Sequence, residues 1–131
     1  MPTEAARPAW IPPGAAVRWA HVGDAGWHAV SVPLIIGAVT LTALGDDTGA
    51  IIQDDGARRM AWLIRPGAAD TYRLPAEAVV IGDGSRLHVP GLDRGDGVWW
   101  CLPPTGGRPA LTPMPALAAA LAAATAGRRP R

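Results

Sequence analysis

The chain of 131 residues contains no lysine and no phenylalanine, and it has a single cysteine and a single tyrosine. Its twelve basic residues are therefore all arginines, and with eleven carboxylates they leave a formal net charge of +1. This balance excludes a strong overall field that would attract nucleic acid or a membrane surface. The one cysteine, Cys101, cannot form an internal disulfide, which is typical of a reducing compartment.

Long apolar runs are also absent. No run approaches the roughly 20 residues that a membrane span needs, and the first 20 residues lack a basic segment followed by an apolar one. We therefore expect a cytoplasmic protein without a membrane partner. Apolar residues still make up 49% of the chain, which excludes a wholly disordered polypeptide.

The prolines indicate where the packed domain starts. Four of the first 14 residues are prolines, a composition that resists packing into a core. We predict a flexible Pro-rich arm over residues 1–14, a single α+β domain over 15–126 and a basic tail over 127–131.

Two segments have helical features. Residues 33–44 carry apolar side chains at helical spacing, Ser31 stands where an N-cap is expected, and Gly45 can end the helix. Residues 115–125 are rich in alanine, the strongest helix former. The sequence predicts a helix at each place, and residues 27–32 are interpreted as leading into the first.

Strand signals lie mainly between the two helices. Residues 49–53 and 58–65 are joined by turn-forming residues, and the second strand has apolar residues on both alternating faces. That pattern is typical of an interior strand covered on both sides. Residues 79–81 and 86–89 predict a hairpin, because Gly-Asp-Gly-Ser stands between them.

Residues 98–102 predict a final strand, and 17–22 a short edge strand. The expected fold is α+β: a small, mostly antiparallel sheet of four to five strands, with one helix before it and one after it.

One stretch resembles a known family. The run RRMAWLIRPGAADTYRLPAEAVVIGDGSRLHVPGLDRGDGVWWCLPP is similar to the later half of the bifunctional DNA primase/polymerase N-terminal (prim-pol) domain. Residues 61–63 with 66–67 stand for its strand and Pro-Gly turn, 81–90 for its glycine-containing hairpin, and 98–100 for its aromatic strand. The whole chain also resembles short stand-alone actinobacterial proteins. The resemblance implies a polymerase-like scaffold.

The family's catalysis rests on carboxylates that hold metal ions against the triphosphate and the primer hydroxyl. The resemblance implies an Asp-x-Asp/Glu pair upstream and a histidine before the first strand, but this chain has no Asp-x-Asp and carries Arg58 and Arg59 near the histidine position. We therefore expect a degenerate active site without catalytic residues and without a cofactor. The alternative is residual metal-dependent nucleotidyl transfer, with Asp54 or Asp55 holding Mg²⁺ or Mn²⁺.

No other metal or nucleophile motif is present. The histidines and Cys101 do not pair at zinc-ligand spacing, so we predict no metal site.

Arginine placement predicts a binding surface. Arg59 and Arg65 fall at the two ends of one expected strand, and Arg86 and His88 share a face of the next hairpin. With Arg58, these five residues would form a cationic sheet face suited to phosphate and base stacking. The expected ligand is single-stranded nucleic acid or a nucleotide, and the open alternative is a solvated face without a ligand.

A protein partner is the other predicted ligand. Trp10, Trp99 and Trp100 are the residues that we expect at such a contact, because tryptophans often anchor interfaces.

Overall fold

The computed structural model describes residues 8–105 and 110–126. The helices and strands of this part, in chain order, are β1 (Val17–His21), β2 (His28–Pro33), α1 (Leu34–Leu44), η2 (Gly45–Asp47), β3 (Ile51–Asp54), β4 (Arg59–Ile64), β5 (Val79–Ile81), β6 (Arg86–Pro90), β7 (Val98–Leu102) and α2 (Met114–Ala126). The basic tail predicted over 127–131 and the first half of the arm, residues 1–7, lie outside the described residues.

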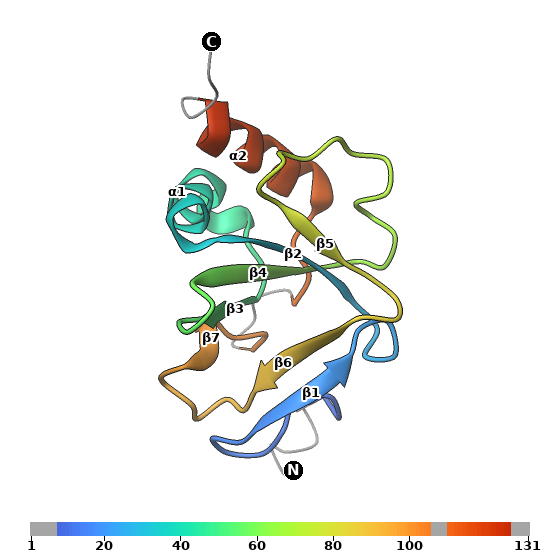
Figure 1. The fold of residues 1–131 in the computed structure, drawn as a ribbon, viewed down its shortest axis with the longest axis vertical. Coiled ribbons are helices and arrows are strands. Elements are labelled where there is room, and N and C mark those ends of the chain that lie inside the picture. Colours follow the sequence, from blue (N-terminus) through green and yellow to red (C-terminus); the bar gives the residue numbers. More distant parts are fainter. Residues whose placement is uncertain (1–7, 106–109, 127–131) are drawn as a thin grey trace.

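The strands form two antiparallel sheets. One has five strands in the order β5-β2-β4-β3-β7, and the other is a two-stranded ribbon of β1 and β6. The helices cover one face of the five-stranded sheet and the ribbon lies against the other (Figure 1). The predicted α+β class is confirmed, although two strands precede the first helix and the ribbon adds a second sheet.

β4 lies at the centre of the five-stranded sheet. Its residues Met60, Trp62 and Ile64 are buried toward the helices, whereas Ala61 and Leu63 are buried toward the ribbon. Residues two apart on a strand share a face, so an apolar residue at every position requires a cover on both sides. The prediction of a doubly covered interior strand is confirmed.

Residues 27–32 do not lead into a helix, as the sequence suggested, but form β2 between β5 and β4. The reason is the same double burial: Ala29, Val30 and Val32 are all 0% exposed and face alternate sides. Trp27, the residue directly before β2, is also buried.

α1 begins without the predicted serine cap. Pro33 occupies the N-cap position, and the amide of Leu34 donates to the carbonyl of Arg58 at 2.8 Å. Ser31 lies within β2, opposite Ala61 on β4, and its hydroxyl accepts a hydrogen bond from Arg59 Nε. Gly45 ends the helix with a φ of 56°, a left-handed conformation that favours glycine.

The predicted hairpin of residues 79–81 and 86–89 is wrong. β5 pairs with β2, and β6 pairs with β1, more than 60 residues earlier in the chain. The turn between them is anchored from outside: the Asp83 carboxylate accepts from His28 Nε2 at 2.9 Å, and the Ser85 carbonyl accepts from the amide of Val22. These contacts hold the turn in place where the chain passes from β5 in the five-stranded sheet to β6 in the ribbon.

The described part of the arm packs on the ribbon side. Ile11 is 1% exposed, and Trp10 lies edge-on against Trp27 with ring centroids 5.3 Å apart. In the part of the chain that the structure describes, neither helix has the length and apolarity needed to cross a bilayer.

Candidate functional site

A cleft opens between the ribbon and the ribbon-facing side of the five-stranded sheet, with a volume of about 310 Å³. This is at the small end of the roughly 300–1,000 Å³ typical of small-molecule sites. Most of its lining is apolar and comes from strands of the sheet and from both strands of the ribbon. The lining residues are Trp19, Ser31, Ile52, Asp54, Ala57, Arg59, Met60, Ala61, Val79, Ile81, Leu87, His88 and Val98.

The polar floor of the cleft is built by Arg59 and Ser31. Arg59 Nε donates to Ser31 Oγ at 2.7 Å, and Arg59 Nη2 donates to the Ser31 carbonyl at 2.9 Å and to the Glu77 carbonyl at 3.3 Å. β2 and β4 pair in a register that places Ser31 opposite Ala61, so the arginine reaches diagonally across the strand pair. These bonds fix the guanidinium in one position.

The mouth of the cleft carries an aromatic stack. Trp19 on β1 pairs with His88 on β6, and their rings are stacked with centroids 3.5 Å apart. The Arg86 guanidinium carbon lies 4.8 Å from the Trp19 ring centroid, within the range of a cation–π contact. Trp19 remains 48% exposed, whereas the adjacent Ala20 is buried.

The carboxylates that could hold a metal do not converge. Asp54 Oδ1 accepts from the amide of Ala57, while the Asp55 oxygens accept from Gln53 Nε2 and Trp99 Nε1. The other pair, Asp46 and Asp47, belongs to η2 before β3, at the opposite end of that strand. Within residues 8–105 and 110–126, no three His, Cys, Asp or Glu side chains gather in a way that could bind a metal ion.

No family model, curated protein or solved structure matches this chain.

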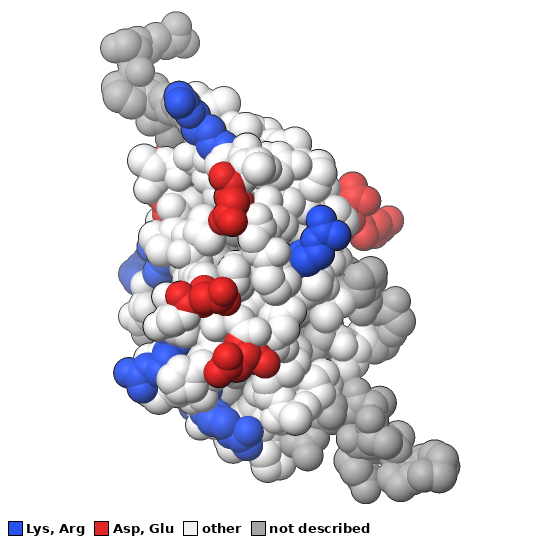
Figure 2. All heavy atoms as spheres, turned by 90° about the vertical axis from the view of Figure 1, so that its right-hand side faces the viewer, with Lys and Arg blue, Asp and Glu red and all other residues white. Residues whose placement is uncertain are grey.

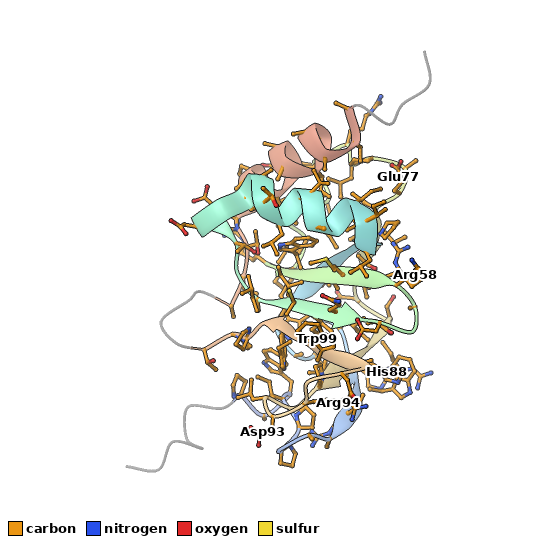
Figure 3. All side chains as sticks on the ribbon, turned by 90° about the vertical axis from the view of Figure 1, so that its left-hand side faces the viewer. Arg58, Glu77, His88, Asp93, Arg94 and Trp99 are labelled. Carbon is orange, nitrogen blue, oxygen red and sulfur yellow. The ribbon has the colours of Figure 1, made fainter. Side chains whose placement is uncertain are left out.

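The predicted cationic residues fall into two places. Arg59 and His88 line the cleft, and Arg86 lies over Trp19 at its mouth. Figure 3 shows Arg58, on the β3–β4 turn, on the same side of the molecule as His88. Arg65 directly follows the other end of β4. It lies six residues after Arg59, which corresponds to about 20 Å along an extended strand, and it lines a separate pocket.

The arginines of this region are not neutralised by direct partners. Among the described residues, no arginine has a carboxylate oxygen within 4.0 Å. Charges of both signs are nevertheless interspersed on the face that Figure 2 presents. Attraction of an anion therefore depends on the local arrangement at the cleft.

The three tryptophans predicted for a partner contact have structural roles. Trp100 is 6% exposed and donates to the Pro90 carbonyl at 2.7 Å, and Trp10 packs against it. Trp99 is half-buried, and its indole N–H is held by Asp55 at 3.0 Å. None of the three lines the cleft.

Sequence reasoning missed Trp19, the tryptophan at the mouth of the cleft. The local run Arg-Trp-Ala-His carries a signal, because a tryptophan that alternates with a buried alanine on a short strand points away from the core. The partner strand could not be identified, since β6 is distant in the sequence.

Cys101 lies outside the cleft. It stands at an irregularity of the β3–β7 pairing, where Ile51 faces Leu102 and Ile52 faces Trp100. Burial raises the pKa of its thiol.

The arrangement suits a flat heterocycle that carries an anionic group. The apolar walls can cover the two faces of a ring, the fixed guanidinium and hydroxyl can bond its polar edge, and Trp19 with Arg86 can contact a second ring or a phosphate.

Proposed function

We propose that this chain is a non-catalytic, primase/polymerase-like module that binds a nucleotide or a nucleotide unit of single-stranded nucleic acid in the cleft. The observation that carries the proposal is the half-exposed indole of Trp19 at the cleft mouth, beside Arg86. Proteins that bind single strands combine aromatic side chains, on which the bases stack, with basic side chains that attract the phosphates.

The size and lining of the cleft support one base rather than an extended strand. A volume of about 310 Å³ with mainly apolar walls fits a single ring system. Arg86 at the mouth and Arg58 on the same side can contact the phosphates of one or two nucleotides.

Titration at low ionic strength tests the proposal. Because one or two phosphates would be contacted, affinity for a short oligothymidylate should fall roughly 3- to 7-fold between about 50 and 200 mM salt. Binding can be followed by tryptophan fluorescence, since Trp19 is exposed enough to be quenched by a stacked base.

Paired arginine variants locate the site. Arg86→Ala should weaken binding and lower the salt slope by about 0.7 for one missing phosphate contact. Arg65→Ala removes the same charge at the far end of β4 and should bind like the native chain. Absence of binding at low salt by the native chain, or equal weakening in both variants, would overturn the proposal and leave a protein partner as the ligand to test.

Residual nucleotidyl transfer has no observation of its own in its favour. Asp54 and Asp55 bind different partners, and only Asp54 lines the cleft. Primer extension with Mg²⁺ or Mn²⁺ that is abolished by Asp55→Ala would overturn the non-catalytic assignment.

A further inference from the structure

Ser31 presents an unused hydrogen-bond donor to the cleft. The residue is 7% exposed, and its Oγ accepts the Nε–H of Arg59 at 2.7 Å. A serine hydroxyl also has one proton to donate, and no acceptor for it exists among the described residues. Because Ser31 lines the cleft, an oxygen atom of a ligand bound there could accept this proton.

Arg59 provides a second donor beside the first. Its Nε and Nη2 are held by Ser31 and by the Glu77 carbonyl, while Nη1 has no partner in the described part of the chain. The guanidinium is planar and rigid, so fixing two of its nitrogens also fixes the direction of the third. The cleft therefore has preorganised donors where β2 meets β4.

Asp54 provides an acceptor on the next strand. It stands opposite Arg59 in the β3–β4 register, and its Oδ1 is used by the amide of Ala57 at 2.9 Å. Its Oδ2 has no partner among the described residues, and the residue lines the cleft. Neighbouring strands are about 4.8 Å apart, so the Arg59 donor and the Asp54 acceptor stand side by side, close enough to bond two adjacent groups on one edge of a base.

We infer that the cleft selects a base that has a carbonyl oxygen next to a ring N–H, as in hypoxanthine, guanine, uracil and thymine. This rests on the proposed nucleotide binding. The carbonyl oxygen accepts from Ser31 and Arg59, and the ring N–H donates to Asp54. Adenine and cytosine reverse both positions: an amino group meets the donors, and an unprotonated ring nitrogen meets the carboxylate.

The reversed donor and acceptor positions of adenine and cytosine determine how strongly the cleft should discriminate against these two bases. Hydrogen-bonding groups that match one base edge are left unpaired, or face a like group, when the other edge is bound. Such a mismatch weakens binding of the wrong base by about 5- to 150-fold. The phosphate and ribose are the same in both cases, so their contribution cancels in the comparison.

Calorimetric titration with matched mononucleotides tests this inference on the native chain. Inosine monophosphate should bind at least about 5-fold more tightly than adenosine monophosphate, and uridine monophosphate more tightly than cytidine monophosphate by a similar factor. 1-Methylinosine monophosphate lacks the ring N–H and should lose this advantage, a result that needs no protein variant.

An Asp54→Asn variant tests the acceptor directly. The amide oxygen can keep the bond to the Ala57 amide while an NH₂ donor replaces Oδ2, so the preference for inosine over adenosine monophosphate should disappear or reverse. Asp47→Asn, an exposed position in η2, is the matched control and should keep it.

The outcomes separate this inference from the proposed function. Failure of all mononucleotides and of the oligonucleotide to bind removes the proposed function. Binding with equal affinities within each pair, or selectivity that survives 1-methylation of the base, overturns the inference and leaves nucleotide binding in place.

Discussion

Replacing Trp19 by alanine should separate ligand binding from folding. Trp19 is 48% exposed and lies outside both apolar clusters, so its removal forms no cavity in the core. The substitution breaks the stack on His88 and the cation–π contact with Arg86, which together stabilise the fold by about 1–2 kcal/mol. Without base stacking, binding should weaken by about 1–3 kcal/mol, or roughly 5- to 150-fold in Kd.

Urea unfolding and nucleotide titration on the same preparations measure both quantities. Trp19→Phe retains a stacking ring and should recover most of the affinity. Trp100→Phe is the matched control: it removes a buried indole whose N–H binds Pro90, so it should lower stability with little change in Kd. If the Trp19→Ala protein folds correctly and binds with native affinity, the assignment of Trp19 at the cleft mouth as the base-stacking residue is refuted.

Four further predictions concern the scaffold. Trp62→Phe should lower the urea-unfolding free energy by about 1–3 kcal/mol, because Trp62 is 0% exposed and its N–H binds Thr48 Oγ at 3.0 Å. Gly49→Ala should cost about 1–3 kcal/mol in the same measurement, since a Cβ there would lie 2.7 Å from the Leu111 carbonyl carbon. For Cys101, burial raises the thiol pKa, so alkylation near neutral pH should be slower in the folded chain than in urea. Because the folded state holds the Cys101 proton more tightly, stability should be full below the ordinary thiol pKa and fall as pH rises through the raised value, which urea midpoints at increasing pH would show.

Local sequence pattern was sufficient for elements whose burial is visible in their own residues. The apolar residues on both faces of β4 predicted its central place, and Gly45 and the alanine-rich segment marked one end of α1 and the position of α2. The 54–57 turn was predicted for the same reason, since Asp54 binds the amide of Ala57 within it.

Pairing between distant strands could not be read from local pattern. The residues 82–85 have the composition of a tight hairpin turn, but the anchors that redirect this turn, His28 and Val22, lie far away in the sequence. Residues 27–32 are ambiguous for a related reason, because a short apolar run before a proline suits a helix lead-in as well as a buried strand.

The candidate site was predictable only in part. Arg59, Arg86 and His88 were singled out from their strand positions, and the structure brings them to one cleft. Arg65 was grouped with them because it follows the strand that begins at Arg59, but strand length separates the two. The position of Trp19 at the cleft depends on the pairing of β1 with β6. The orientation of the Ser31 hydroxyl depends on its contact with Arg59. Neither the pairing nor the contact can be predicted from local sequence pattern.

The most direct test of nucleotide binding in the cleft is an NMR titration that follows the indole N–H signals of the tryptophans. With inosine monophosphate or a short oligothymidylate, the Trp19 signal should shift progressively, whereas that of Trp62, buried on the helix side of the sheet, should stay in place. Shifts of the backbone amides of Ser31 and Arg59 should accompany the Trp19 shift. Unmoved Trp19, Ser31 and Arg59 signals at saturating ligand, or shifts confined to the helices or to the pocket beside Arg65, would contradict the account.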